Sequence, residues 1–97
     1  MATRNTWPQI VKAMETVRSE SWEQMSERHG DWGRDAALWL SRKRGGYRLR
    51  ELGLLAGGLD YATVGQAISR FRKRLEKDRE LKSQFEAVEK QLSNVEM

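Results

Sequence analysis

The chain has 97 residues, which is enough for one small domain with a modest core. It contains no cysteine and one histidine, so disulfides and thiolate metal sites are excluded and a zinc site is not expected. No run approaches the roughly 18 apolar residues of a membrane span, and the N-terminus lacks the apolar core of a signal peptide. We therefore expect a cytoplasmic protein.

Positive charge is concentrated in the middle of the chain. Residues 34–79 hold 12 basic and 5 acidic residues, a net charge of +7, whereas the whole chain carries +4. A localised basic excess is typical of a surface that faces nucleic-acid phosphates. An ordinary solvated face is the alternative interpretation.

Two helices are predicted in the N-terminal third. Thr6 is placed to cap a helix near residues 6–18, and Pro8 falls in the first turn, where proline is tolerated. Ser19 or Ser21 can cap a second, short helix that ends near Gly30, and Ser21 and Gln24 have the spacing of a capping box.

A third helix should begin at about Asp31 or Arg34 and end at Arg44, because the glycine pair at 45–46 offers left-handed backbone. The basic run Arg42-Lys43-Arg44 falls in its last turn, where cations favour the helix dipole. That is a sufficient structural reason for these charges, and contact with DNA is an additional possibility.

Four tryptophans lie in the first half of the chain, at positions 7, 22, 32 and 39. Their large rings are expected to build the core of a domain this small. Trp32 stands beside glycines in a predicted loop and is the one expected to be exposed.

The segment around residues 48–77 has the pattern of a helix-turn-helix. A short amphipathic helix that contains Leu49 and Leu52, with Leu55 or Ala56 as its last inward residue, is followed by Gly57-Gly58. Asp60 is then placed to cap a second amphipathic helix. In this motif the second helix reads the DNA major groove.

That second helix has two distinct faces. At 100° per residue, an apolar side is formed by Val64, Ala67, Ile68, Phe71 and Leu75. A polar and basic side is formed by Thr63, Gln66, Arg70, Lys73 and Lys77. We expect the apolar side to pack in the bundle and the polar side to face outward.

The tail forms a last amphipathic helix at about residues 79–95. Its apolar stripe has heptad spacing and consists of Leu81, Phe85, Val88, Leu92 and Val95. The stripe can pack back on the bundle, across the N-terminal helix, or form a coiled-coil dimer through residues 81–95. We expect a monomer, because the stripe is shorter than a persuasive coiled coil.

These elements predict an all-α fold, a small bundle of five to six helices that forms one domain over residues 1–97. No catalytic constellation is visible, because one histidine and no cysteine leave few arrangements for nucleophilic catalysis. The carboxylates stand beside Lys and Arg and are expected to form solvated ion pairs. We expect no enzyme activity, no cofactor and no metal.

From Arg34 to Phe71 the chain resembles the C-terminal DNA-binding domain of the bacterial replication initiator DnaA, of the Trp-repressor-like superfamily. The agreeing positions are Arg34, Glu51, Gly53, Gly57, Gly58, Asp60, Thr63, Val64 and Ala67. The chain departs from the family at three of its base-reading positions, where Leu59, Tyr61 and Ala62 stand in place of Arg, His and Thr. The loop at 29–33 also lacks the family's basic charge.

A closer resemblance is to the DnaA-like tail of REP-associated tyrosine transposases. It rests on the run from Tyr61 to Phe71, the basic run Arg72-Lys73-Arg74 and the segment Asp78-Arg79-Glu80-Leu81. It extends from about Arg34 to Leu92. The resemblance implies the DNA-recognition part of such a protein, without the metal motif and catalytic tyrosine of the transposase domain.

The sequence therefore predicts a non-catalytic, sequence-selective DNA-binding module that recognises duplex or hairpin DNA, associates with the nucleoid and has no contact with membranes. The predicted DNA-binding residues are Arg34, Arg48, Arg50, Asp60, Tyr61, Ala62, Thr63, Gln66, Arg70 and Lys73. The alternative is a helical protein-interaction module that uses the stripe in the tail.

Overall fold

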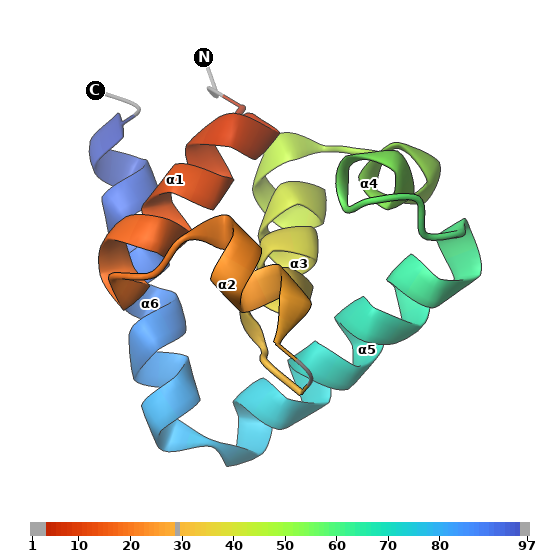
Figure 1. Cartoon of the computed structure of the whole chain (residues 1–97). Helices are drawn as coiled ribbons and strands as arrows, with labels where there is room; N and C mark the ends of the chain where they lie inside the picture. The colour runs from red at the N-terminus through yellow and green to blue at the C-terminus, as the bar shows by residue number, and fades with distance from the viewer. Residues whose placement is uncertain (1–3, 29, 96–97) are drawn as a thin grey trace.

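The computed structural model describes residues 4–28 and 30–95, with the side chains of residues 94 and 95 left out. Within these residues the chain forms six helices and no strand (Figure 1). The helices are α1 Trp7–Arg18, α2 Trp22–Glu27, α3 Gly33–Gly45, α4 Leu49–Leu55, α5 Tyr61–Lys77 and α6 Arg79–Val95. The predicted all-α class and its helix count are confirmed.

Local capping sets the first two helix starts, as predicted. The Thr6 hydroxyl accepts the Gln9 N–H, and the Gln9 side chain accepts the Thr6 N–H in return. The Ser21–Gln24 pair repeats this reciprocal arrangement at α2. Each pair satisfies two N–H groups that a helix start would leave without a partner. The second helix ends earlier than predicted, at Glu27.

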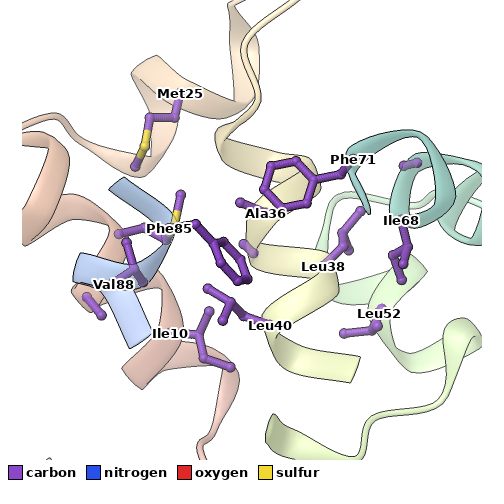
Figure 2. Close-up of a cluster of buried hydrophobic side chains, with 14 of the residues drawn as sticks. Ile10, Met25, Ala36, Leu38, Leu40, Leu52, Ile68, Phe71, Phe85 and Val88 are labelled. Carbon is purple, nitrogen blue, oxygen red and sulfur yellow. The ribbon is translucent and has the colours of Figure 1, made fainter. Parts of the chain in front are cut away.

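Helix α3 occupies the centre of the bundle and contacts α1, α2, α4 and α5 (Figure 1). Figure 2 shows its side chains among those of the surrounding helices. Its fully buried apolar residues are Ala36, Ala37, Leu38 and Leu40. Two small side chains, Ala36 and Ala37, precede two large ones, Leu38 and Leu40, so neighbouring helices can approach the first part of α3 closely while the leucines fill the core.

Helix α6 folds back across α1, which is the intramolecular packing favoured from the sequence (Figure 1). The stripe residues Leu81, Phe85, Val88 and Leu92 are all buried in the core. The Phe85 ring lies 5.5 Å from the Phe71 ring of α5, centroid to centroid. Val95, also predicted in the stripe, has its side chain outside the described residues.

Trp32, the tryptophan singled out as the candidate for exposure, is partly buried, as are Trp22 and Trp39. The Trp32 ring stacks on Phe71, with centroids 6.3 Å apart and an interplanar angle of 26°. The guanidinium carbon of Arg18 lies 4.3 Å from the Trp32 ring centroid. The loop before α3 is therefore held against the bundle, because an indole ring buries a large apolar area when it stacks.

The ion pairs of Asp31 are not solvated, contrary to the expectation for the carboxylates, because the Asp31 side chain is only 2% exposed. Its carboxylate accepts hydrogen bonds from Arg18 at 2.5 Å, from Arg28 at 2.8 Å and from the Gly33 N–H at 2.7 Å. Desolvation alone would raise the pKa of Asp31, but these hydrogen bonds and the two guanidinium charges together lower it. The carboxylate thereby joins the end of α1 to the start of α3.

Candidate nucleic-acid interface

The turn between α4 and α5 is built on two consecutive left-handed glycines. Gly57 has φ of 106° and Gly58 has φ of 91°, values that residues with a β-carbon rarely adopt. The N–H groups of Gly58 and Leu59 both donate to the Gly53 carbonyl oxygen, each at 2.9 Å. The chain therefore leaves α4 and enters α5 within five residues.

Asp60 caps α5 as predicted, and its carboxylate accepts the Thr63 N–H at 2.8 Å. This hydrogen bond is the largest cause that lowers the pKa of Asp60. The ionised carboxylate thus occupies the start of the helix dipole. Asp60 positions the first turn of α5, and its carboxylate is already engaged by backbone.

The outer face of α5 begins at this capped end. Tyr61, Ala62 and Gln66 are exposed and Thr63 is partly exposed, whereas Val64 is fully buried under them. The predicted division of α5 into an inner apolar side and an outer polar side is confirmed. Four of the ten predicted site residues therefore gather on one accessible helix end.

Arg50 of α4 joins this end through an aromatic contact that the sequence did not indicate. Its guanidinium carbon lies 5.5 Å from the ring centroid of Tyr61, which is 54% exposed. Such a contact holds the flexible arginine near the start of α5. Arg48, the N-cap residue two positions earlier, is exposed, and its backbone N–H donates to the Glu51 carboxylate at 2.9 Å.

Two leucines of α4 are also exposed beside this end. Leu54 is 79% exposed and Leu55 is 41% exposed, while Ala56 is partly buried against the core. Of these two alternatives for the last inward residue, the structure favours Ala56, the C-cap residue that follows α4. The surface around the start of α5 therefore mixes apolar and basic groups.

The remaining predicted residues lie farther along α5 and α3. Arg70 is 67% exposed and forms an ion pair with Asp35 of α3 at 3.2 Å. Lys73 is exposed, one turn after Arg70. Arg34 is partly buried and lines a cleft with Arg70, on the α3 side of α5. The ten predicted residues thus fall into two groups, one at the start of α5 and one near its middle.

The basic run at the end of α3 is engaged within the bundle. Lys43 lies 3.0 Å from the Glu89 carboxylate of α6, and Arg44 lies 3.6 Å from it. Arg42 donates to the Tyr47 carbonyl oxygen at 2.8 Å. These contacts within the chain support a structural role for the basic run. Contact of the run with DNA stays a prediction.

Two further arginines of α5 were not singled out from the sequence. The guanidinium carbon of Arg72 lies 4.6 Å from the ring centroid of Trp39, and Arg74 lines the same cleft as Arg34. Their place in the basic run 72–74 was the available signal. The sequence of the run alone did not show that Arg72 contacts Trp39 of α3 or that Arg74 lines the cleft.

Within the described residues, no three His, Cys, Asp or Glu side chains gather closely enough to hold a metal ion. Over the same residues, none of the helices combines the length and apolar character needed to cross a membrane. No protein-family model, curated protein or solved structure matches the chain. The resemblance to DnaA-like domains therefore rests on the residues that carry it.

Proposed function

We propose that this chain is a non-catalytic, sequence-selective DNA-binding domain that inserts the start of α5 into the major groove. The observation that carries the proposal is the exposed, capped end of α5. Helix-turn-helix proteins contact base edges with this end of their second helix. Tyr61, Ala62, Thr63 and Gln66 are the side chains available there.

The charges around this end support the same proposal. Arg48 precedes α4 as its N-cap residue, Arg50 lies on α4, and Lys73 continues the outer face of α5. Phosphate contacts of this kind position a protein on the duplex without specifying sequence. Gln66 is the side chain suited to specify it, because a glutamine amide can form two hydrogen bonds with adenine.

The protein-interaction alternative has no observation in its favour. It relies on the apolar stripe of α6, and the described members of that stripe, from Leu81 to Leu92, are buried against the rest of the chain. A partner would have to displace α6 from the core to reach them.

The experiment begins with selection from random duplex and hairpin DNA, followed by binding titrations on the selected site. Gln66→Ala should weaken binding by about 1–3 kcal/mol and relax the preference at one base pair. Ser83→Ala, an exposed position on α6, is the control and should leave binding unchanged. Unaltered affinity and sequence preference in Gln66→Ala would remove Gln66 from the proposed contact.

Salt concentration gives a separate test of the DNA proposal. Binding driven by phosphates releases counterions, so the affinity should fall steeply, by orders of magnitude, between low and moderate salt. A selection that enriches no sequence, together with binding that is insensitive to salt, would overturn the proposal.

A further inference from the structure

Large apolar side chains are exposed at one place in the part of the chain that the structure describes. They are Leu54 and Leu55 at the end of α4 and Tyr61 at the start of α5, on the two sides of the glycine turn. Leu54 is the most exposed of them, at 79%. Exposed apolar groups that gather in one region commonly mark an interaction site, because their burial contributes little to the fold.

The contacts of Arg50 place Leu54 and Tyr61 on the same surface. Arg50 and Leu54 are four residues apart on α4, so they share one face of that helix. The guanidinium carbon of Arg50 lies 5.5 Å from the Tyr61 ring centroid, and the ring stays half exposed with this contact in place. Leu54 and Tyr61 thus form an apolar pair that flanks Arg50. Leu55 projects about 100° farther around α4, away from this face.

The charges around the apolar pair favour a nucleic-acid occupant. Arg48 and Arg50 are exposed beside it. The two acidic side chains of this region are engaged by backbone, since Glu51 accepts the Arg48 N–H at 2.9 Å and Asp60 accepts the Thr63 N–H at 2.8 Å. A DNA duplex offers phosphates to the arginines. Its major groove also offers one strongly apolar group at each A·T pair, the C5-methyl group of thymine.

We propose that the apolar pair contacts the C5-methyl group of a thymine, which makes Leu54 a specificity-determining residue. This inference rests on the proposed function and extends its reading surface from α5 to the end of α4. Gln66 would read adenine through hydrogen bonds, whereas Leu54 and the Tyr61 ring remove a methyl group from water. The recognised site therefore contains a thymine whose methyl group matters apart from its base pairing.

The test replaces each thymine of the selected duplex, one at a time, with deoxyuridine, which pairs with adenine in the same way and lacks only the methyl group. At one thymine the replacement should weaken binding of the parent chain by about fourfold, the effect of one methyl group removed from an apolar contact. In Leu54→Gln the same replacement should have less than about a twofold effect. Tyr61→Phe should keep the full ratio, because the ring and not the hydroxyl contacts the methyl group.

Leu55→Gln is the matched control, the same change on a neighbouring exposed leucine outside the proposed contact. It should keep the fourfold ratio between the thymine and deoxyuridine duplexes. Leu54→Gln should also keep the denaturant midpoint of the parent chain, because Leu54 is exposed and glutamine is a good helix former. A lost ratio in this variant then reports a lost contact with DNA and not a misfolded domain.

Three results would overturn this inference: no thymine whose replacement weakens the parent chain, a full ratio that persists in Leu54→Gln, or an equal loss of the ratio in Leu55→Gln. Each of them leaves the sequence preference that depends on Gln66 in place, so the failure of the methyl contact is distinguishable from the failure of the proposed function. A chain that selects no DNA sequence would overturn both.

Discussion

The carbonyl oxygen of Leu59 lies directly against the α-carbon of Gly53, so close that a β-carbon on Gly53 would overlap it. The same turn brings the N–H groups of Gly58 and Leu59 onto the Gly53 carbonyl oxygen. Gly53 thus allows the backbone of α4 and the backbone before α5 to pack without an intervening side chain. The conformation of the turn between α4 and α5 depends on this one close approach.

Gly53→Ala should therefore destabilise the domain by about 2–3 kcal/mol, because the added methyl group forces two backbone segments apart. Gly65→Ala is the matched control. Its β-carbon would meet only Leu49, at an ordinary 3.7 Å, and alanine stabilises a helix interior by roughly 0.5–1 kcal/mol. Chemical denaturation of both variants measures the difference, and equal stabilities would contradict the role given to Gly53.

The features predicted correctly from the sequence are those that depend on neighbouring residues. The caps at Thr6, Ser21 and Asp60 each bind an N–H three residues ahead, so a short window contains all the information needed. The two faces of α5 follow from helical periodicity in the same way. The places of α4 and α5 were predictable for this reason, whereas the assignment of a helix-turn-helix and its contact with DNA stay predictions.

The features that the sequence did not reveal depend on residues brought together by the fold. Arg18 and Asp31 are 13 residues apart, and Lys43 and Glu89 are 46 apart. Nothing local distinguishes these charges from solvated ones. The partial burial of Trp32 was hidden for the same reason, since it depends on the contact with Phe71 of α5.

Asp31 should make stability dependent on acid pH. Its pKa is lowered in the folded protein, so its contribution is present above the unfolded value of about 3.9 and is lost as pH falls through the folded value. Asp31→Asn should cost about 3 kcal/mol near neutral pH, because it leaves Arg18 without its closest charge. The destabilisation caused by Asp31→Asn should become smaller below about pH 4, where the carboxylate of the parent protein is increasingly protonated.

Denaturant unfolding of both proteins between pH 7 and pH 3 measures this difference. Glu27→Gln, an exposed neighbour on α2, serves as the control and should differ little from the parent protein at any pH. A constant difference between the parent protein and Asp31→Asn across this range would show that the ionised carboxylate is not the source of the stability.

The two exposed cations of the outer face should respond differently to salt. Lys73→Ala should reduce the slope of log affinity against log salt by about one unit if Lys73 contacts a phosphate. Arg70→Ala should reduce it less, because Asp35 already neutralises part of that charge. Asp35→Asn should raise affinity for all sequences alike, and Lys82→Ala on α6 provides the control. Unchanged slopes in both variants would show that Lys73 and Arg70 are ordinary surface charges without phosphate contacts.

We expect helix α6 to contribute to the stability of the whole domain. Phe85 is buried against Phe71, so Phe85→Ala should lower the free energy of unfolding by about 3–5 kcal/mol, whereas Glu86→Ala at the exposed neighbour should change it by less than about 0.5 kcal/mol.

A chain that ends at Asp78 should expose Trp7 and lose cooperative unfolding. Sedimentation should show a monomer. A stable truncated domain, or a dimer that persists on dilution, would favour a coiled coil through residues 81–95.

Because α6 returns along α1, the start of α1 and the end of α6 lie on the same side of the bundle, and the start of α5 lies on the other side (Figure 1). A tether attached at either end would therefore leave the proposed reading surface unobstructed. The domain could be fused to a reporter, or anchored to a sensor surface by either terminus, with the same face presented to DNA. The same geometry makes the chain suited to circular permutation, since a short linker could join its ends without crossing α5.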